Sequence, residues 1–443
     1  MVRKVLIKHG CVVTNNRKNE IKKLDVFVEG NRIKEVKKDL NIEDAKVINA
    51  ENRVIIPGFI QTHVHLTQTL FKNRADNLEL LEWLTRRVWP FEAMHTENSN
   101  YISSKLGLAE LIRSGTTTIL DMGTVRHHNS VFEAVNESGI RAVSGKCMMD
   151  CGKNVPKELL ESTEDSINES IGLLKKWHNR GDGRIKYAFA PRFVISCSEE
   201  LFLKVKELSQ EHGVMIHTHA SENRSEVELI VREKGMGNIK YLNKLNITGA
   251  NLVLAHCIWL DEEELDILSV TGTKVSHCPS SNLKLASGIA KIPEMLRHGI
   301  NVSLGADGAP CNNNLNIFRE MRTASLIQKT RLSSPTVMSA ETVFRMATLE
   351  GAKALNLEDE IGSIEAGKKA DIVILNLNKT ASYPYNQEDV ISAIVYSADS
   401  LNVETVMADG KILMQKGKLL TINEDSVIKD SERAVLDITK NIS

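Results

Sequence analysis

The stretch that decides the fold of this 443-residue chain is Pro57–His65, with the sequence PGFIQTHVH. It opens on a proline and a glycine, continues as a short run suited to a buried strand, and ends in His63 and His65. Side chains alternate between the two faces of a strand, so these two imidazoles point to the same side. The pattern predicts a strand that presents two candidate metal ligands at its end.

The region around this stretch alternates short apolar runs with longer helical patterns such as Ser99–Arg113 and Ser198–His212. The strand candidates are Gly58–His65, Thr117–Met122, Arg141–Met148, Ile185–Ala190, Val214–His219, Leu252–Cys257, Lys274–Cys278 and Asn301–Gly305. Strand–helix alternation repeated in this way predicts an α/β fold, a (β/α)₈ TIM barrel over residues 57–364. A doubly wound open sheet is the alternative.

Both ends of the chain carry a different pattern, with short strands separated by turns such as Gly30-Asn31 and Asp409-Gly410. We expect residues 1–56 and 365–443 to form one small β-sandwich domain together. A helical pattern near Ser426–Ile438 predicts a C-terminal helix that covers this domain or a neighbouring subunit.

The composition is that of an ordinary globular protein, with 42% hydrophobic and 26% charged residues and a net charge of −1. This balance indicates no nucleic acid and no membrane as partner, so a small-molecule substrate is expected. The start lacks a signal-peptide pattern, and no apolar run approaches the ~18 residues of a membrane span. The seven cysteines are scattered and form no CxxC pair, which is typical of reduced thiols in a cytoplasmic protein. We also expect a homo-oligomer.

Polar side chains of metal-binding type end several of the predicted strands, where functional groups of such barrels lie. The strand ends carry His63, His65, His217, His219, His256 and Asp307. Imidazoles with a carboxylate suit Zn²⁺ best, with Fe²⁺ or Mn²⁺ as alternatives. Of the two histidines on the fifth strand, we interpret His219 as the ligand, because it lies closer to the strand end, and His217 as a supporting residue. Glu222 follows three residues later and can reach an attacking water and the substrate together.

The chain resembles the amidohydrolase superfamily in Pro57–His65 and in five further motifs. These are HASE at 219–222, LAHC at 254–257, HCPSSNLKL at 277–285, GADGA at 305–309 and EAGKKADIV at 365–373. Together they look like the branch that holds methylthioadenosine/S-adenosylhomocysteine deaminases, 5′-deoxyadenosine deaminases, guanine deaminases and triazine hydrolases. The resemblance covers nearly the whole chain and implies a hydrolase that releases ammonia from the 6-amino group of adenosine-type nucleosides. The candidate substrates are 5′-deoxyadenosine, 5′-methylthioadenosine, adenosine and, less favoured, S-adenosylhomocysteine.

The resemblance also implies roles for the strand-end residues. His63, His65, His219 and Asp307 would bind one divalent metal ion per subunit, with Zn²⁺ expected. Glu222, His256 and Asp307 would be the catalytic residues: Glu222 as the proton shuttle to a ring nitrogen and His256 as a contact of the attacking oxygen. Dinuclear relatives carry a carboxylated lysine at the end of the fourth strand, where this chain reads AFAPR at 188–192. A mononuclear site is therefore favoured, and a bridging Lys146 is the alternative.

The expected substrate contacts are Glu92, Trp89, Arg192, His277 and Lys146. The resemblance implies that Glu92 holds ribose hydroxyls, the alternative being the start of a solvated helix beside a packed tryptophan. Arg192 stands where relatives often have histidine, and it could read a polar substrate group or pair with a nearby acid. His277 and the loop after it are expected to line the base site, or else to have a structural role. Lysines such as Lys146 stand where homocysteine-recognising relatives use arginines, which weakens the case for S-adenosylhomocysteine.

Other functions fit parts of the same pattern. The metal site also suits a guanine or oxidised-purine deaminase and an s-triazine hydrolase. A non-catalytic metal-binding relative would have lost Glu222 or Asp307, and both are present. A cyclic-amide hydrolase of the dihydroorotase or imidazolonepropionase kind is a further alternative on fold-level analogy.

Overall fold

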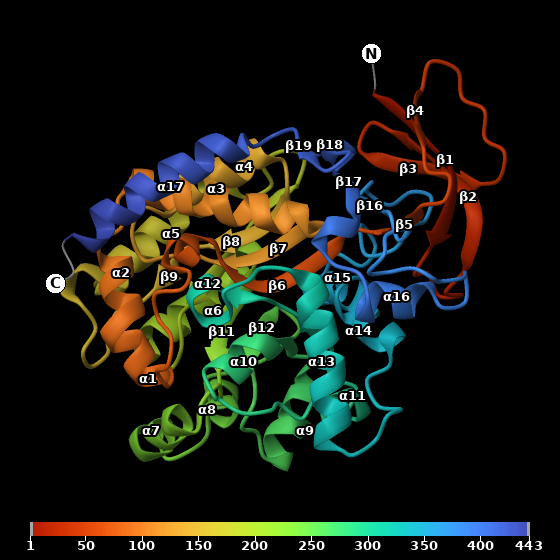
Figure 1. Cartoon of the computed structure of the whole chain (residues 1–443). Coiled ribbons are helices and arrows are strands. Elements are labelled where there is room, and N and C mark those ends of the chain that lie inside the picture. Colours follow the sequence, from red (N-terminus) through yellow and green to blue (C-terminus); the bar gives the residue numbers. More distant parts are fainter. Residues whose placement is uncertain (1–2, 441–443) are drawn as a thin grey trace.

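The computed structural model describes residues 3–440, and its central feature is a parallel sheet surrounded by helices (Figure 1). The barrel strands are β6 (Phe59–His65), β7 (Thr116–Met122), β8 (Arg141–Gly145), β9 (Cys147–Met148), β10 (Ile185–Pro191), β11 (Met215–Ala220), β12 (Leu252–His256), β13 (Lys274–His277), β14 (Val302–Leu304) and β15 (Asp307–Gly308). All eight predicted strands form. The third is divided into β8 and β9, both of which pair with β10.

The last strand closes the sheet into a barrel by changing partner. β14 pairs in parallel with β13, and the chain then continues into β15, which pairs in parallel with β6. Gly305 lies between β14 and β15, where a Cβ atom would come within 2.6 Å of the His63 carbonyl oxygen. Only glycine allows the chain to pass so close to β6. The predicted (β/α)₈ barrel is therefore confirmed, and the open-sheet alternative is excluded.

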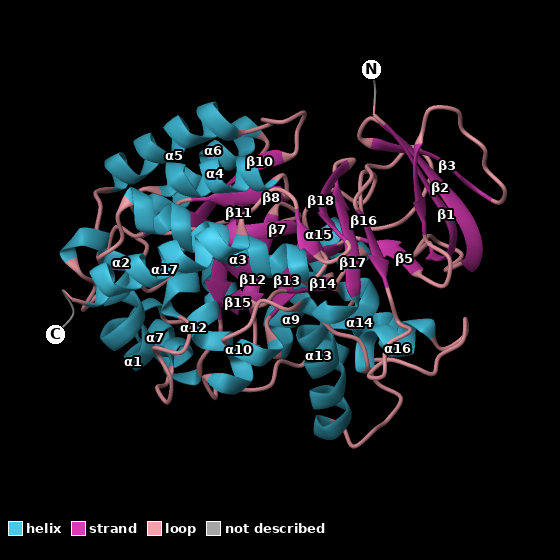
Figure 2. Cartoon of the chain, turned by 45° about the horizontal axis from the view of Figure 1, so that its top comes forward, coloured by secondary structure: helices cyan, strands magenta, loops and turns pink. Residues whose placement is uncertain are grey.

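Helices cover the outside of the barrel between successive strands (Figure 2). They include α3 (Glu97–Arg113), α4 (His128–Ser138), α5 (Thr163–Trp177), α6 (Glu199–His212), α7 (Arg224–Lys234), α8 (Asn238–Lys244), α9 (Glu262–Thr271), α11 (Ile292–Arg297), α13 (Ile317–Arg331), α14 (Ala340–Met346) and α15 (Leu349–Ala354). Local signals set their ends: the Ser198 hydroxyl accepts from the Leu201 N–H at the start of α6, and left-handed Gly213 ends it.

The interior of the barrel toward the N-terminal ends of the strands is filled with apolar side chains, one from most strands. Ile60, Leu120, Val143 and Val253 belong to this cluster. Leu355, directly after α15, closes it. The opposite, C-terminal end of the strands carries the polar residues. This division places any chemistry at the C-terminal mouth, as the barrel fold requires.

Strands from both chain ends form a second sheet, in the order β19-β18-β17-β16-β5-β1-β2-β3 with β4 beside β1. Their bounds are β1 (Lys4–Val13), β2 (Ile21–Glu29), β3 (Arg32–Lys37), β4 (Lys46–Asn49), β5 (Val54–Pro57), β16 (Ile372–Leu375), β17 (Val403–Ala408), β18 (Lys411–Gln415) and β19 (Lys418–Leu419). The antiparallel pair of β5 and β16 joins the two ends of the chain. The sheet stands beside the barrel (Figure 1).

The C-terminal helix α17 (Glu424–Thr439) lies on the barrel and not on this second sheet, where we expected it. Ala434 and Ile438 pack in one cluster with Leu70, Phe71 and Phe91. The sequence predicted a helix near Ser426–Ile438, which forms, but the surface that this helix covers belongs to the barrel. The short helix α16 (Val390–Tyr396) also packs on barrel helices, α13 and α14.

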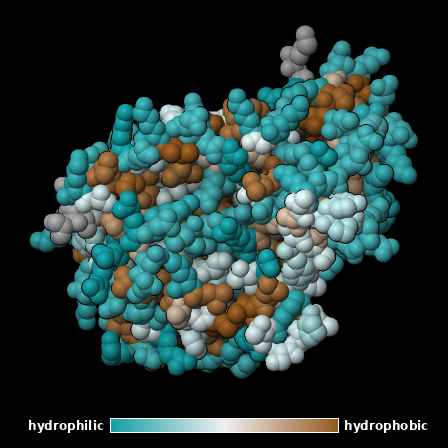
Figure 3. All heavy atoms as spheres, in the orientation of Figure 1, coloured by the Kyte–Doolittle hydropathy of each residue, from teal (hydrophilic) through white to brown (hydrophobic). Residues whose placement is uncertain are grey.

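The face of the molecule in Figure 3 is mainly hydrophilic, with apolar residues in separate small groups. Within residues 3–440, no helix combines the length and the apolar character needed to cross a membrane.

Candidate metal centre and substrate cavity

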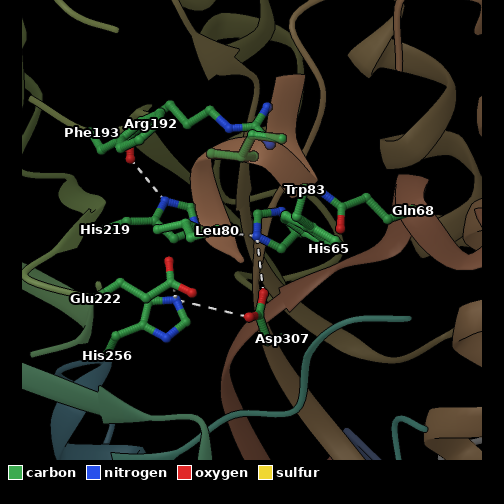
Figure 4. A pocket seen from close by; sticks show the side chains of 11 residues that line it. His65, Gln68, Leu80, Trp83, Arg192, Phe193, His219, Glu222, His256 and Asp307 are labelled. Carbon is green, nitrogen blue, oxygen red and sulfur yellow. Dashed lines mark hydrogen bonds and ion pairs between the residues drawn. The ribbon is translucent and has the colours of Figure 1, made fainter. Parts of the chain in front are cut away.

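Five polar side chains from β6, β11, β12 and β15 meet at the C-terminal mouth of the barrel. Figure 4 shows His65, His219, His256 and Asp307 of this set. Four of them, His63, His219, His256 and Asp307, have ligand atoms that all lie within 4.8 Å of one another. His65 joins them, because its Nε2 is 3.3 Å from Asp307 Oδ1 and 3.2 Å from His219 Nε2. The residues that the sequence placed at strand ends are thus brought together in space.

The histidines of this cluster use Nδ1 for a fixed contact and turn Nε2 toward the centre. His65 Nδ1 lies 2.8 Å from the Met122 carbonyl, His219 Nδ1 lies 2.8 Å from the Arg192 carbonyl, and His256 Nδ1 lies 2.8 Å from Asn282 Oδ1. A carbonyl oxygen only accepts, so each Nδ1 carries the hydrogen and each neutral ring keeps a lone pair on Nε2. Such outer contacts are typical of metal-binding histidines.

His63 obtains the same orientation through His217. The Val253 carbonyl accepts from His217 Nδ1 at 3.1 Å, so His217 Nε2 must accept from His63 Nδ1 at 2.8 Å. His63 Nε2 then keeps its lone pair and lies 3.2 Å from Asp307 Oδ1. His217 therefore supports a candidate ligand and does not face the cavity itself.

Burial lowers the pKa of His63, His65 and His219 and keeps these three imidazoles neutral. It lowers the pKa of His65 to about 3, with the neighbouring His63 adding to the effect. The pKa of His219 is also well below its ordinary value, first through burial and then through the nearby histidines. A neutral imidazole is the form that binds a metal, so the cluster is prepared for a cation.

The two carboxyl groups of the site are shifted in opposite directions. Burial and the nearby Asp307 charge raise the pKa of Glu222 well above its ordinary range. Burial alone would raise the pKa of Asp307 as well, but His63, His256 and His65 outweigh it and hold that pKa well below its ordinary value. Such a separation marks one carboxyl as a proton donor and the other as a proton acceptor.

Backbone strain accompanies the site. His256 and Asp307 have φ values of 73° and 64°, in the left-handed region that favours glycine. Non-glycine residues in such conformations cost about 1–3 kcal/mol each and are concentrated at functional sites.

The hydroxyl of Ser281 donates to Asp307 Oδ2 at 2.6 Å, and the Glu226 carboxylate accepts from the Glu222 N–H at 2.7 Å. These contacts fix the Asp307 carboxylate and the backbone of Glu222.

A small cavity adjoins the cluster. It is lined by His65, Gln68, Leu80, Trp83, Leu84, Arg192, Phe193, His219, Glu222, His256 and Asp307. Leu80, Trp83 and Leu84 come from a cover segment, residues 80–93, which consists of α1 (Leu80–Trp83), the π-helical turn η2 (Leu84–Val88) and α2 (Trp89–Ala93).

Arg192 and Glu92, both expected to contact substrate, bind each other. Arg192 Nη1 donates to Glu92 Oε2 at 2.7 Å, with both side chains buried. Arg192 lines the cavity, whereas the Glu92 side chain is fully covered and is not part of the lining. Of the two roles that the sequence left open for Arg192, the structure shows the pairing with an acid.

Three other expected contacts lie away from the cavity lining. Trp89, in helix α2 of the cover segment, packs among apolar side chains. Trp83, in α1 of the same segment, lines the cavity instead. His277 is buried, and burial lowers its pKa to about 3. Lys146 is buried in ion pairs with Glu161 at 2.5 Å and Glu169 at 2.7 Å, so its charge is already balanced. Strand position predicts which end of the barrel a residue occupies, but not which way its side chain turns, and the roles of these three residues in substrate binding stay predictions.

Sequence reasoning missed Gln68, Glu226 and Asn282. The one available signal for Gln68 was its place three residues after His65, in the 3-10 turn η1 (Leu66–Phe71). The segment after His277 was expected to be a loop, but it forms helix α10 (Pro279–Lys284), which supplies Ser281 and Asn282 as supports of Asp307 and His256.

A closed (β/α)₈ barrel with a buried His/Asp cluster at its C-terminal mouth defines the class of metal-dependent barrel hydrolases. The chain belongs to the amidohydrolase family, whose model matches residues 54–413.

Several relatives match almost the whole chain. The 5′-deoxyadenosine deaminase of Methanothermobacter thermautotrophicus is 42% identical over 95% of this chain and 96% of its own length. The 5-methylthioadenosine/S-adenosylhomocysteine deaminase of Thermococcus onnurineus is 39% identical over 98% of this chain and 100% of its own. Among solved structures, an adenosine deaminase from Xanthomonas campestris with bound zinc superimposes with a TM-score of 0.93 at 28% identity, covering 99% of both chains.

Proposed function

We propose that this chain is a hydrolytic deaminase that converts the 6-amino group of adenosine-type nucleosides to a carbonyl and releases ammonia. The observation that carries the proposal is the placement of Glu222, a buried carboxyl with raised pKa, beside a His/Asp cluster at the cavity of the barrel mouth. Relatives named as deaminases match the chain along nearly its full length. A hydrolase of this class acts on a carbon–nitrogen bond.

We also propose that His63, His65, His219 and Asp307 hold one Zn²⁺ ion. The donor set fits, because buried His63 Nε2 has no hydrogen-bond partner and the His65 and His219 Nε2 atoms face the same centre. Three imidazoles with one carboxylate suit zinc. When bound, such an ion lowers the pKa of water toward ~7 and makes a nucleophile available at neutral pH.

The protein groups would then act in a fixed order. Asp307, whose pKa is held low, accepts the proton that the attacking water loses. Protonated Glu222 donates to the ring nitrogen next to the amino-bearing carbon. His256, whose Nε2 lies 3.4 Å from Glu222 Oε2 and 3.8 Å from Asp307 Oδ2, contacts the oxygen that adds to the ring. The amine takes up the proton that Asp307 holds, the carbon–nitrogen bond breaks and ammonia leaves. The added hydroxyl gives its proton back to Glu222 and becomes the carbonyl of the product.

The test is ammonia release from 5′-deoxyadenosine, 5′-methylthioadenosine, adenosine, S-adenosylhomocysteine, guanine and aminotriazines. We expect turnover with the adenosine-type nucleosides. Glu222→Gln keeps the shape of the side chain but cannot supply the proton, so we expect turnover to fall by ~10²–10⁴ while the metal content is unchanged. Activity restricted to guanine, or near-wild-type turnover of the variant, would contradict the proposal.

A further inference from the structure

Gln68 is a buried side chain at the cavity whose hydrogen bonds are only half used. Its Nε2 donates to Glu92 Oε1 at 2.9 Å. Its Oε1 is buried and has no hydrogen-bond partner among the described residues. Leaving a buried acceptor unpaired is unfavourable, so its presence at a binding cavity points to a ligand that supplies the missing donor. In Figure 4, Gln68 lies across the cavity from Glu222.

The pairing of Glu92 with Arg192 fixes which end of the Gln68 amide faces the cavity. Arg192 has only donor groups, and it donates to both Glu92 oxygens, at 2.7 Å to Oε2 and at 3.5 Å to Oε1, so both of these oxygens act as acceptors. Gln68 must therefore turn its NH₂ group to Glu92, which leaves Oε1 as an acceptor. Gly308 provides the space for this atom, because a Cβ there would lie 2.0 Å from Gln68 Oε1.

We propose that Gln68 Oε1 accepts a hydrogen bond from a sugar hydroxyl of the substrate and so determines specificity for ribosides. This inference rests on the proposed function. 5′-Deoxyadenosine, 5′-methylthioadenosine and adenosine have hydrogen-bond donors only at the amino group and the sugar hydroxyls, because their free ring nitrogens are acceptors. The amino group belongs beside Glu222 and Asp307, so a hydroxyl is the donor left for Gln68. Glu92 and Arg192 are then positioning residues that act through the Gln68 amide.

The inference is tested by substrate discrimination within one enzyme. The substrates are 5′-deoxyadenosine and its analogues that lack the 2′- or the 3′-hydroxyl. For the hydroxyl that Gln68 reads, we expect the wild-type enzyme to reject the lacking analogue by at least about tenfold in kcat/KM, because a site built for a hydroxyl is left unpaired without it. Gln68→Met has a similar shape and no amide, so its ratio is expected to fall to about one. A ratio does not depend on the fraction of active enzyme.

Gln328→Met is the matched control. Gln328 is also buried and uses its amide, donating to the Ala290 carbonyl at 2.8 Å and accepting from Arg331 Nε at 2.7 Å, but it lies outside the cavity lining. We expect this variant to keep the wild-type ratio. Glu92→Gln removes the charge that fixes the amide, so its ratio should fall between those of the wild type and Gln68→Met.

Two results would overturn the inference: a wild-type enzyme that deaminates the analogues lacking either hydroxyl as well as 5′-deoxyadenosine, or a Gln68→Met variant that keeps the full wild-type ratio. Failure of the proposed function looks different. In that case the metal-loaded wild type releases ammonia from free purine bases or triazines and from no adenosine-type nucleoside.

Discussion

At the scale of single residues, the site is defined by which ring nitrogen each histidine commits to the protein. His65 and His219 donate from Nδ1 to backbone carbonyls, and His63 donates to His217. The residues at strand ends could be predicted as candidate ligands from their positions in the sequence, and these contacts show how each ring is oriented. They also show why Gln68 could not: its importance lies in an unpaired oxygen, which only the packing of Glu92 and Arg192 reveals.

The choice of ligands gives a prediction at this scale. His65 faces the cluster through Nε2, 3.3 Å from Asp307, whereas His256 Nε2 lies between two carboxyl groups that we assign to proton transfer. We expect His65→Asn to lose most of its zinc and His256→Asn to keep zinc near one ion per chain while losing turnover. Elemental analysis after dialysis measures both. His277→Asn, a buried histidine outside the proposed ligands, serves as the control.

The opposite result would identify a different ligand set. If His256→Asn lost the metal and His65→Asn kept it, the ion would be held by His63, His219, His256 and Asp307, the four residues whose ligand atoms lie closest together.

At the scale of elements, short helices behind the strand ends hold the site in shape. Helix α10 supports Asp307 and His256 through Ser281 and Asn282. Helix α13 in turn holds α10, because Glu320 accepts from the Ser280 N–H at 3.2 Å and from Asn312 Nδ2 at 2.9 Å. Strand periodicity predicted the eight barrel strands well, but not α10 or the cover segment, since helices of four to six residues depend on tertiary contacts more than on their own sequence.

Glu320 makes stability depend on pH. Burial raises its pKa to about 7 in the folded protein, from an ordinary value of 4.5. The folded state therefore binds more protons than the unfolded state between these values, and its contribution to stability is lost as the pH rises from 4.5 through 7. At ~1.4 kcal/mol per pKa unit, the loss is of order 3 kcal/mol. Glu320→Gln cannot ionise, so its stability relative to the wild type should rise between pH 5 and pH 8.

Thermal unfolding of both proteins at pH 5, 6, 7 and 8 measures this effect. The difference in Tm between the variant and the wild type should grow with pH and level off above about pH 7. A difference that stays constant over this range would show that Glu320 does not titrate there.

At the scale of the whole molecule, a buried ion pair joins the barrel to the second sheet. Arg141, at the beginning of β8, donates to both carboxylate oxygens of Asp371, at 2.9 and 3.0 Å, and to Asp409 at 3.0 Å. The Thr118 hydroxyl also donates to Asp371. The sequence predicted that both chain ends build one β domain together, but not that its strands form a single sheet, nor where this sheet or α17 would dock. An amphipathic pattern shows that a face is buried and does not name its partner.

This junction provides the last prediction. Arg141→Met leaves Asp371 as a buried charge without its cation, so we expect a loss of about 3–5 kcal/mol in the free energy of unfolding. The matched control is Arg53→Met, which breaks the pair of Arg53 and Glu404 in the same sheet. Those side chains are 27% and 32% exposed, so the cost should stay below ~1 kcal/mol. Arg141 lies at the N-terminal end of its strand, away from the cavity, and the folded variant should therefore keep wild-type kcat/KM.

Chemical denaturation measures the stability and ammonia release measures the activity. Equal destabilisation by both variants would show that the junction is not the main contact between the two parts of the molecule, whereas a large fall in kcat/KM of folded Arg141→Met would show that it also shapes the site.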